Sequence, residues 1–183
     1  MSQRFPIHTI ANAPDGSRPV LQTLQQAFGV VPNVAGAIAG SPILATGFLG
    51  LFRNVHAGTF SEAEIQVLLL TNAVTNGSAW AVAFHTALAL NEGLAESDVA
   101  AIRAGDAPSN PRHAALSRLA STLIERRGQI EDAEVDRFVA AGFDPAQALE
   151  VIGVVAASTI TNYAAGMTRP PLEDAFQAHA WAA

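Results

Sequence analysis

The chain has 183 residues, of which 50% are hydrophobic and 14% are charged. This length suits one domain with a substantial core, which we expect to span residues 1–183. A formal charge of −6 argues against nucleic acid or an anionic membrane surface as partner, because both bind basic faces. The charged fraction is also below the roughly 25% of an ordinary soluble domain. Because few charged side chains are available to keep the surface hydrated, we expect part of that surface to be buried in a homo-oligomer.

The sequence contains no cysteine. Disulfides, thiolate metal sites and thiol redox catalysis are therefore excluded. Residues 1–16 lack the apolar stretch of a secretory signal. The most apolar later stretch, Val151 to Met167, is interrupted by polar residues and falls short of the about 20 apolar residues of a membrane span. We predict a buried helix there, no membrane association and a cytoplasmic protein.

Helix start and stop signals recur along the chain with short gaps between them. They predict an extended arm over residues 1–17, helices over 18–28, 33–39, 42–58, 61–74, 78–91, 96–104, 111–128, 133–141 and 145–167, and a C-terminal tail over 172–183. Asn33 and Ser41 are predicted as caps, and Ser61 with Glu64 as a capping box. No segment alternates apolar and polar residues as a strand would. The predicted fold class is all-α.

The organising feature is a pair of almost wholly apolar helices within residues 59–94, separated by Asn76 and Gly77. A helix that is apolar on every side must be buried, so the rest of the chain is expected to cover this pair. The second helix carries a lone histidine, His85. A buried imidazole needs hydrogen-bond partners or performs chemistry.

Ser78, Ala81 and His85 follow one another at i, i+3 and i+7, close to one line on this second helix. Ser78 begins the helix, where free backbone N–H groups favour an anion and where a thiol would have a lowered pKa. The residue present is a hydroxyl, which we expect to cap the helix. Ser78 and His85 are not predicted to form a nucleophile–base pair, because seven helical residues separate them by roughly 10 Å.

The chain resembles the superfamily of AhpD-type alkylhydroperoxidases and carboxymuconolactone decarboxylases. Four stretches carry the resemblance, at residues 28–33, 41–42, 61–93 and 128–163. It implies an AhpD-like helical bundle around the buried helix pair, and a dimer, trimer or hexamer.

In the peroxidase branch of that superfamily, a glutamate, a Cys-x-x-Cys pair and a histidine form the central motif. The corresponding positions here are Gln66, Ser78 with Ala81, and His85, so that only the histidine is kept. Glu64 lies two residues from the glutamate position, about 200° around the helix, and is better explained as part of the capping box. Thiol peroxidase activity is therefore not expected.

Three functions remain open. The first is a cofactor-independent lyase or related enzyme acting on a small organic acid, as in the decarboxylase branch, with His85 as general acid or base. Ser78 at the helix start would then hold a carboxylate, and Gln66 and Trp80 would contact the substrate. The second is a redox-dead protein that binds a small molecule or serves as a scaffold. The third, which the family label suggests and the residues oppose, is alkylhydroperoxidase activity.

No metal and no cofactor are expected. The five histidines, at positions 8, 56, 85, 113 and 179, show no spacing typical of metal ligands. Arg53 and His56 are predicted to lie on a solvated face.

Overall fold

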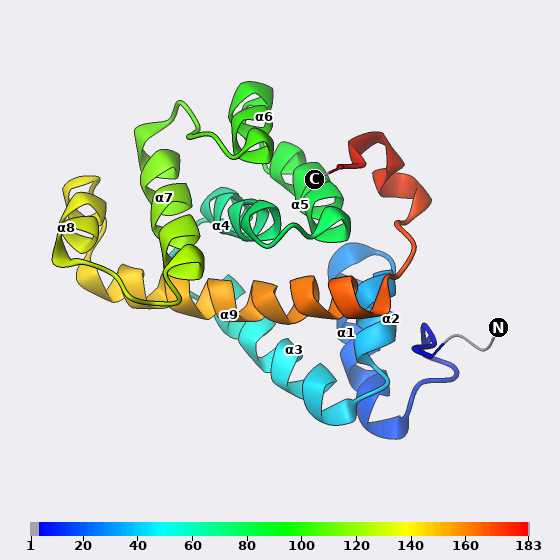
Figure 1. The fold of residues 1–183 in the computed structure, drawn as a ribbon. Coiled ribbons are helices and arrows are strands. Elements are labelled where there is room, and N and C mark those ends of the chain that lie inside the picture. The colour runs from blue at the N-terminus through cyan, green and yellow to red at the C-terminus, as the bar shows by residue number, and fades with distance from the viewer. Residues whose placement is uncertain (1–3, 183) are drawn as a thin grey trace.

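The computed structural model describes residues 4–182, and within this range the chain forms helices, turns and loops without a β-strand (Figure 1). The prediction of an all-α fold is confirmed. The elements in chain order are η1 (Asp15–Ser17), α1 (Arg18–Phe28), α2 (Asn33–Ile38), α3 (Pro42–His56), α4 (Glu62–Thr75), α5 (Ala79–Asn91), α6 (Glu96–Ala104), α7 (Pro111–Glu125), α8 (Asp132–Ala140), α9 (Pro145–Thr168) and η2 (Asp174–His179).

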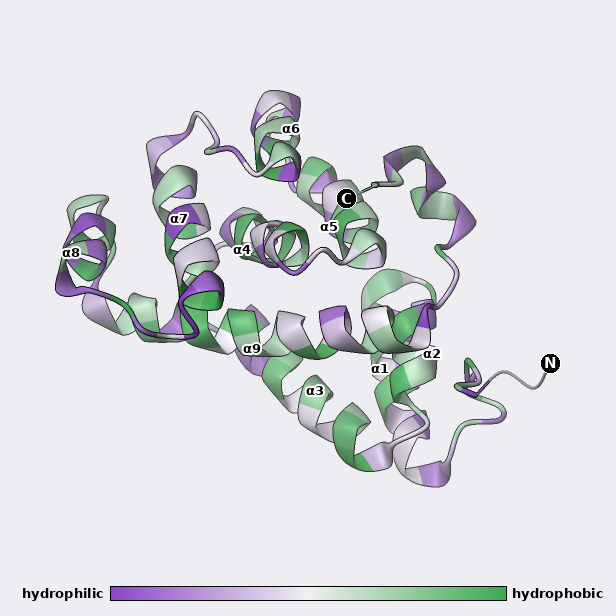
Figure 2. Cartoon of the chain, in the orientation of Figure 1, coloured by the Kyte–Doolittle hydropathy of each residue, from purple (hydrophilic) through white to green (hydrophobic). Residues whose placement is uncertain are grey.

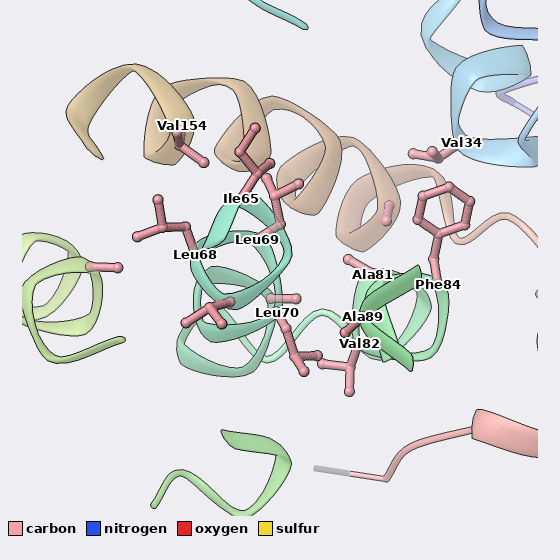
Figure 3. Close-up of a cluster of buried hydrophobic side chains, with 14 of the residues drawn as sticks. Val34, Ile65, Leu68, Leu69, Leu70, Ala81, Val82, Phe84, Ala89 and Val154 are labelled. Carbon is pink, nitrogen blue, oxygen red and sulfur yellow. The ribbon is translucent and has the colours of Figure 1, made fainter. Parts of the chain in front are cut away.

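Helix α4 lies at the centre of the molecule, in contact with α3, α5, α6, α7 and α9 (Figure 1). Ile65, Leu68 and Leu70 have no exposed surface, and they point to different sides of the helix (Figure 3). On α5, Ala81 and Val82 are equally buried. The apolar helix pair is therefore covered by the rest of the chain, as its sequence predicts.

Helix α9 runs the length of the molecule and packs against α2, α3, α4 and α7. It is the one helix within residues 4–182 that is long and apolar enough to cross a membrane, and its hydropathy varies along the helix in Figure 2. Val151 and Val154 are buried on the side that faces α4. The prediction of a buried helix holds for this side only, because the opposite side exposes Leu149, Ile152, Tyr163 and Met167.

Helices α3, α4, α7 and α9 begin with side-chain caps. Ser61 and Glu64 form the capping box of α4, and Asp144 with Gln147 forms another at α9. Ser41 Oγ accepts a hydrogen bond from the backbone N–H of Leu44 at α3. Helices α3 and α7 end two to three residues before the predicted positions, at His56 and Glu125.

The predicted cap at Asn33 is wrong. Asn33 is the first residue of α2 and its backbone N–H donates to the Glu173 carboxylate at 2.6 Å. The side-chain amide of Asn33 donates instead to the backbone oxygen of Pro171 at 3.0 Å. A residue 140 positions away thus caps this helix, which local sequence cannot reveal.

Both terminal segments are more structured than predicted. The arm contains η1, and the His8 backbone N–H donates to the Gly36 oxygen at 3.0 Å. The tail contains η2, which packs on α5 through Phe176 against Phe84. The Arg103 guanidinium also holds the tail by donating to the backbone oxygen of His179 at 3.0 Å.

Candidate functional site

A cavity of about 70 Å³ lies among α1, α2, α3, α4, α5 and α9. Most of its wall is aromatic or aliphatic, and its polar side chains are few. The lining residues are Leu24, Phe28, Pro32, Val34, Ala35, Phe48, Phe52, Val55, His56, Gln66, Leu69, Trp80, Phe84, His85, Leu88, Ala157, Ser158 and Thr161. The volume is several times the about 10–15 Å³ that one water molecule requires.

His85 and Gln66 meet in this wall. The Nδ1 atom of His85 on α5 lies 3.1 Å from Oε1 of Gln66 on α4, and both side chains are buried. An amide oxygen only accepts hydrogen bonds, so this orientation of Gln66 places the imidazole hydrogen on Nδ1. Nε2 then carries the lone pair, and it has no hydrogen-bond partner among residues 4–182.

Burial in apolar surroundings, and secondarily the charge of nearby His56, lower the pKa of His85 to about 3. The imidazole is therefore neutral at pH 7. Its Nε2 can accept a hydrogen bond from a molecule in the cavity, but the ring does not supply a positive charge there.

Trp80 forms another part of the wall in a fixed orientation. Its indole stacks on Phe84 with 5.0 Å between ring centroids and 16° between ring planes. The indole N–H donates to Oε2 of Glu173 at 2.9 Å. Because the other oxygen of Glu173 caps α2, one carboxylate connects the N-terminal region, the central helix pair and the tail.

His56, at the end of α3, also lines the cavity while remaining partly exposed, so the predicted solvated face describes only part of its surroundings. Its Nδ1 lies 2.9 and 3.0 Å from the two carboxylate oxygens of Glu62, the first residue of α4. Its side chain is 25% exposed, which places it at the edge of the cavity. Phe48, Phe52 and His56 follow one another at intervals of four residues, and this spacing could have indicated a shared face.

Ser78 does not lie with the other predicted site residues. It is buried and is not part of the cavity lining. Its Oγ has no hydrogen-bond partner among the described residues, so the side-chain cap predicted for Ser78 is not formed. Ala81, at the second mapped cysteine position, has no exposed surface. The structure therefore brings His85, Gln66 and Trp80 together in one wall and leaves Ser78 outside it.

The residue types present restrict the chemistry of the cavity. The chain contains neither cysteine nor lysine, which removes thiolate and Schiff-base catalysis. Among residues 4–182, no group of three or more His, Asp or Glu side chains is placed to hold a metal ion. Proton transfer and hydrogen bonding by the two imidazoles are the chemistry that the wall itself offers.

Residues 42–120, which run from α3 into α7, match the model of the carboxymuconolactone decarboxylase family. A peroxidase-related protein with an alkylhydroperoxidase AhpD core, from Ralstonia eutropha, has the same fold with a TM-score of 0.82 and 20% identity, over 94% of this chain and 93% of that chain. The chain is thus similar to the carboxymuconolactone decarboxylase family over residues 42–120 and shares the fold of an AhpD-core protein over most of its length. The superfamily resemblance predicted from sequence is thereby confirmed, and the matched segment contains His56, Gln66 and His85.

Two further solved structures share the fold of this chain. A variant of the debrominase Bmp8 in complex with 2,3,4-tribromopyrrole has a TM-score of 0.80 and 18% identity, over 98% of this chain and 96% of that chain. A peroxidase-related protein from a Silicibacter species has a TM-score of 0.75 and 18% identity, over 94% and 92% of the two chains. At such identities the likeness establishes the fold and not the activity. A search of curated proteins finds no significant match.

Proposed function

We propose that the cavity binds a small, mainly apolar, ring-sized organic molecule through a hydrogen bond to His85. The main support is the combination of an aromatic wall with one buried, neutral imidazole whose Nε2 has no protein partner among residues 4–182. Ligand sites of this kind are mostly apolar, with a few polar groups that fix the orientation of the ligand. Gln66 holds the ring of His85, so that Nε2 has a defined direction.

The wall favours a neutral molecule over the small organic acid that the sequence suggested. None of the described lining residues is an arginine, and the chain has no lysine. A carboxylate beside the neutral His85 would be buried without a cationic partner and would be strongly disfavoured. A ring that carries a hydroxyl or an N–H group suits the lone pair on Nε2 of His85. The tribromopyrrole in the debrominase complex is a ring of this class, bound by a protein of the same fold.

A second candidate is a cofactor-independent enzyme that works by proton transfer, of which a lyase is one example. The observation that favours it is the pairing of an imidazole with a side chain that orients it, an arrangement typical of general acid–base sites.

Thiol peroxidase activity lacks its nucleophile here. We expect purified protein to consume no hydroperoxide above background when a dithiol reductant is supplied.

We also propose that the protein forms a homo-oligomer through α9. The exposed side of this helix presents Leu149, Ile152, Tyr163 and Met167 along its length. Large exposed apolar patches commonly mark interaction sites. The variant Ile152→Glu should therefore lower the mass observed by sedimentation velocity, whereas Ser97→Glu on exposed α6 should not. An unchanged mass in Ile152→Glu would contradict this interface.

The binding proposal is tested with 4-bromophenol, because its bromine atom quenches tryptophan fluorescence at close range. In a Trp181→Phe background the remaining tryptophan is Trp80, which lines the cavity. We expect saturable quenching by 4-bromophenol.

The matched variants separate cavity binding from surface binding. Val55→Phe should fill the cavity and remove the quenching, whereas Val139→Phe on the exposed side of α8 should leave it unchanged. Absence of saturable quenching, or quenching that survives Val55→Phe, would overturn the proposal.

A further inference from the structure

The cavity contains a second imidazole, that of His56, in surroundings opposite to those of His85. Its Nδ1 lies within 3.0 Å of both oxygens of the Glu62 carboxylate. A carboxylate accepts hydrogen bonds, so it holds the imidazole hydrogen on Nδ1 and leaves the lone pair on Nε2. The ring is also fixed by Phe52, whose centroid lies 4.4 Å away.

The two histidines differ in the charge of the side chain that bonds to the ring. His85 is buried among apolar side chains with an uncharged amide as its partner. His56 is partly exposed and is paired with a carboxylate, which stabilises the charged imidazolium. When two titratable groups of one site have such different surroundings, their acid–base roles are separated.

We propose that His56, positioned by Glu62, is the proton acceptor of this cavity, and that it takes a proton from an acidic hydroxyl or ring N–H of the bound molecule. The inference rests on the proposed function, in which the cavity holds such a molecule, but it assigns the acidic hydrogen of that molecule to Nε2 of His56 and not to Nε2 of His85. In the step, the O–H or N–H bond of the ligand breaks and an N–H bond forms at Nε2 of His56. The electron pair stays on the ligand heteroatom, so that a ligand anion lies beside an imidazolium whose Nδ1–H donates to Glu62.

The other charged and titratable groups near His56 have different partners. Arg53, one turn earlier on α3, donates to Thr23 of α1 at 3.3 Å. Glu150 of α9 accepts from the backbone N–H and hydroxyl of Thr59, at 2.9 and 3.0 Å. The charge of His56 contributes, after burial, to the lowered pKa of His85 on α5. Within residues 4–182, Glu62 is the carboxylate bonded to the His56 ring.

Two probes with the same nitrobenzene ring separate proton transfer from binding. 4-Nitrophenol has an acidic hydroxyl, and its anion has an absorption band of its own, whereas 4-nitroanisole has the same ring without an acidic proton. Both are titrated into the native full-length protein at a pH below the pKa of free 4-nitrophenol. We expect both probes to bind through the apolar wall, 4-nitroanisole more weakly because it has no hydrogen to donate to a histidine Nε2. Only 4-nitrophenol should change its absorption, with the anion band appearing as the cavity fills.

Glu62→Gln should weaken binding of the 4-nitrophenol anion about tenfold, since it removes the charge that stabilises the imidazolium. His56→Gln should abolish the bound anion band. In both variants binding of 4-nitroanisole should change much less than binding of the 4-nitrophenol anion, whereas a general structural defect would weaken both. The control Glu96→Gln, which removes an exposed carboxylate from the first turn of α6, should behave as native.

The outcomes are distinguishable. If 4-nitroanisole binds but 4-nitrophenol stays neutral, or if the anion band is unchanged in His56→Gln, the assignment of His56 is wrong and the binding site stands. If neither probe binds the native protein, the proposed function fails and this inference fails with it.

Discussion

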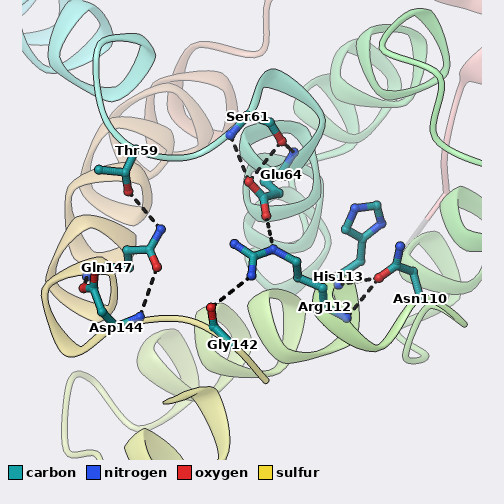
Figure 4. Close-up of polar contacts among 9 residues, drawn as sticks. All are labelled: Thr59, Ser61, Glu64, Asn110, Arg112, His113, Gly142, Asp144 and Gln147. Atoms are coloured by element: carbon teal, nitrogen blue, oxygen red, sulfur yellow. Dashed lines mark hydrogen bonds and ion pairs between the residues drawn. The ribbon is translucent and has the colours of Figure 1, made fainter. Parts of the chain in front are cut away.

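Glu64 and Gln66 lie two residues apart on α4, and they belong to two very different polar regions. Glu64 accepts hydrogen bonds from the backbone N–H and hydroxyl of Ser61, at 2.9 and 3.0 Å, and from Nε of Arg112 at 2.6 Å (Figure 4). Gln66 faces the cavity and has one side-chain partner, the ring of His85. In the first region the charged groups are bonded to one another, and we call it the closed network. In the second region Nε2 of His85 is left without a partner among residues 4–182.

The two regions also differ in charge. Burial raises the pKa of Glu64, but the hydrogen bonds from Ser61 and Arg112 outweigh this effect, so that the pKa lies below its usual 4.5. Burial lowers the pKa of His85 to about 3, and Gln66 brings no charge to offset it. The closed network therefore holds a charged, fully bonded group. The cavity holds a neutral group with an unused nitrogen, and this difference distinguishes a stabilising cluster from a candidate binding site.

The largest expected effect concerns acid stability. His85 has a pKa of about 3 when folded against a usual value of 6.5, so the unfolded chain binds more protons between these values. The free energy of unfolding should fall by about 1.4 kcal/mol per pH unit below pH 6.5, or about 3 kcal/mol by pH 4. His85→Gln cannot be protonated and should lack this component in urea denaturation from pH 7 to pH 4.

The control for this experiment is His179→Gln in the tail, which should keep the native pH dependence. If the native protein and His85→Gln lost stability in parallel over this range, the account of a buried neutral imidazole would be wrong.

A smaller effect is expected in the closed network. Glu64→Ala removes one half of a capping box and the partner of Arg112. Because Arg112 is 42% exposed, the ion pair adds little, and we expect a loss of about 2 kcal/mol in the free energy of unfolding at pH 7. Binding of 4-bromophenol should not change.

The comparison of Glu64→Gln with the native protein gives the pH dependence of this network. Since the folded pKa of Glu64 is lowered, its charge contributes stability above the unfolded value of 4.5 that is lost as the pH falls through the folded pKa. The difference between the two proteins should therefore shrink in acid. A difference that persists at low pH would show that charge is not its cause.

The smallest effect is expected at Glu173, which bonds both Trp80 of the cavity wall and the start of α2. Glu173→Ala removes the acceptor of the Trp80 indole N–H and of the α2 cap, and should cost about 1 kcal/mol. Because Trp80 then loses its fixed orientation, the affinity for 4-bromophenol should fall a few-fold, measured by fluorescence quenching. Asp174→Ala, an exposed neighbour, is the matched control. An unchanged affinity in Glu173→Ala would mean that the indole needs no such support.

Features that depend on neighbours in the sequence were predictable. The box of Ser61 and Glu64, the Asp144-Pro145 start and the terminating glycines delimit helices close to the observed ones, because their hydrogen bonds lie within one turn. The burial of α4 and α5 follows from their composition alone. The match between Gln66, His85 and the superfamily motif also indicated where the candidate site would lie, although the roles of these residues stay predictions.

Features that depend on packing between distant segments could not be predicted. Glu173 reaches both Asn33 and Trp80 only because the tail folds over α5. His56 lines the cavity because the end of α3 contacts the start of α4, where Glu62 bonds its ring, and the sequence around it suggested a solvated face. The contact of Gln66 with His85 requires α5 to fold back against α4, which the turn at Gly77, with a φ of 63°, permits.

The most direct test of the binding site is a crystal structure of the protein soaked with 4-bromophenol, in which the anomalous signal of bromine locates the probe. We expect one strong peak inside the cavity, between Phe28, Trp80 and His85, with the phenol oxygen within hydrogen-bond distance of a histidine Nε2. An empty cavity in crystals whose protein binds the probe in solution, or a peak confined to the molecular surface, would contradict the account.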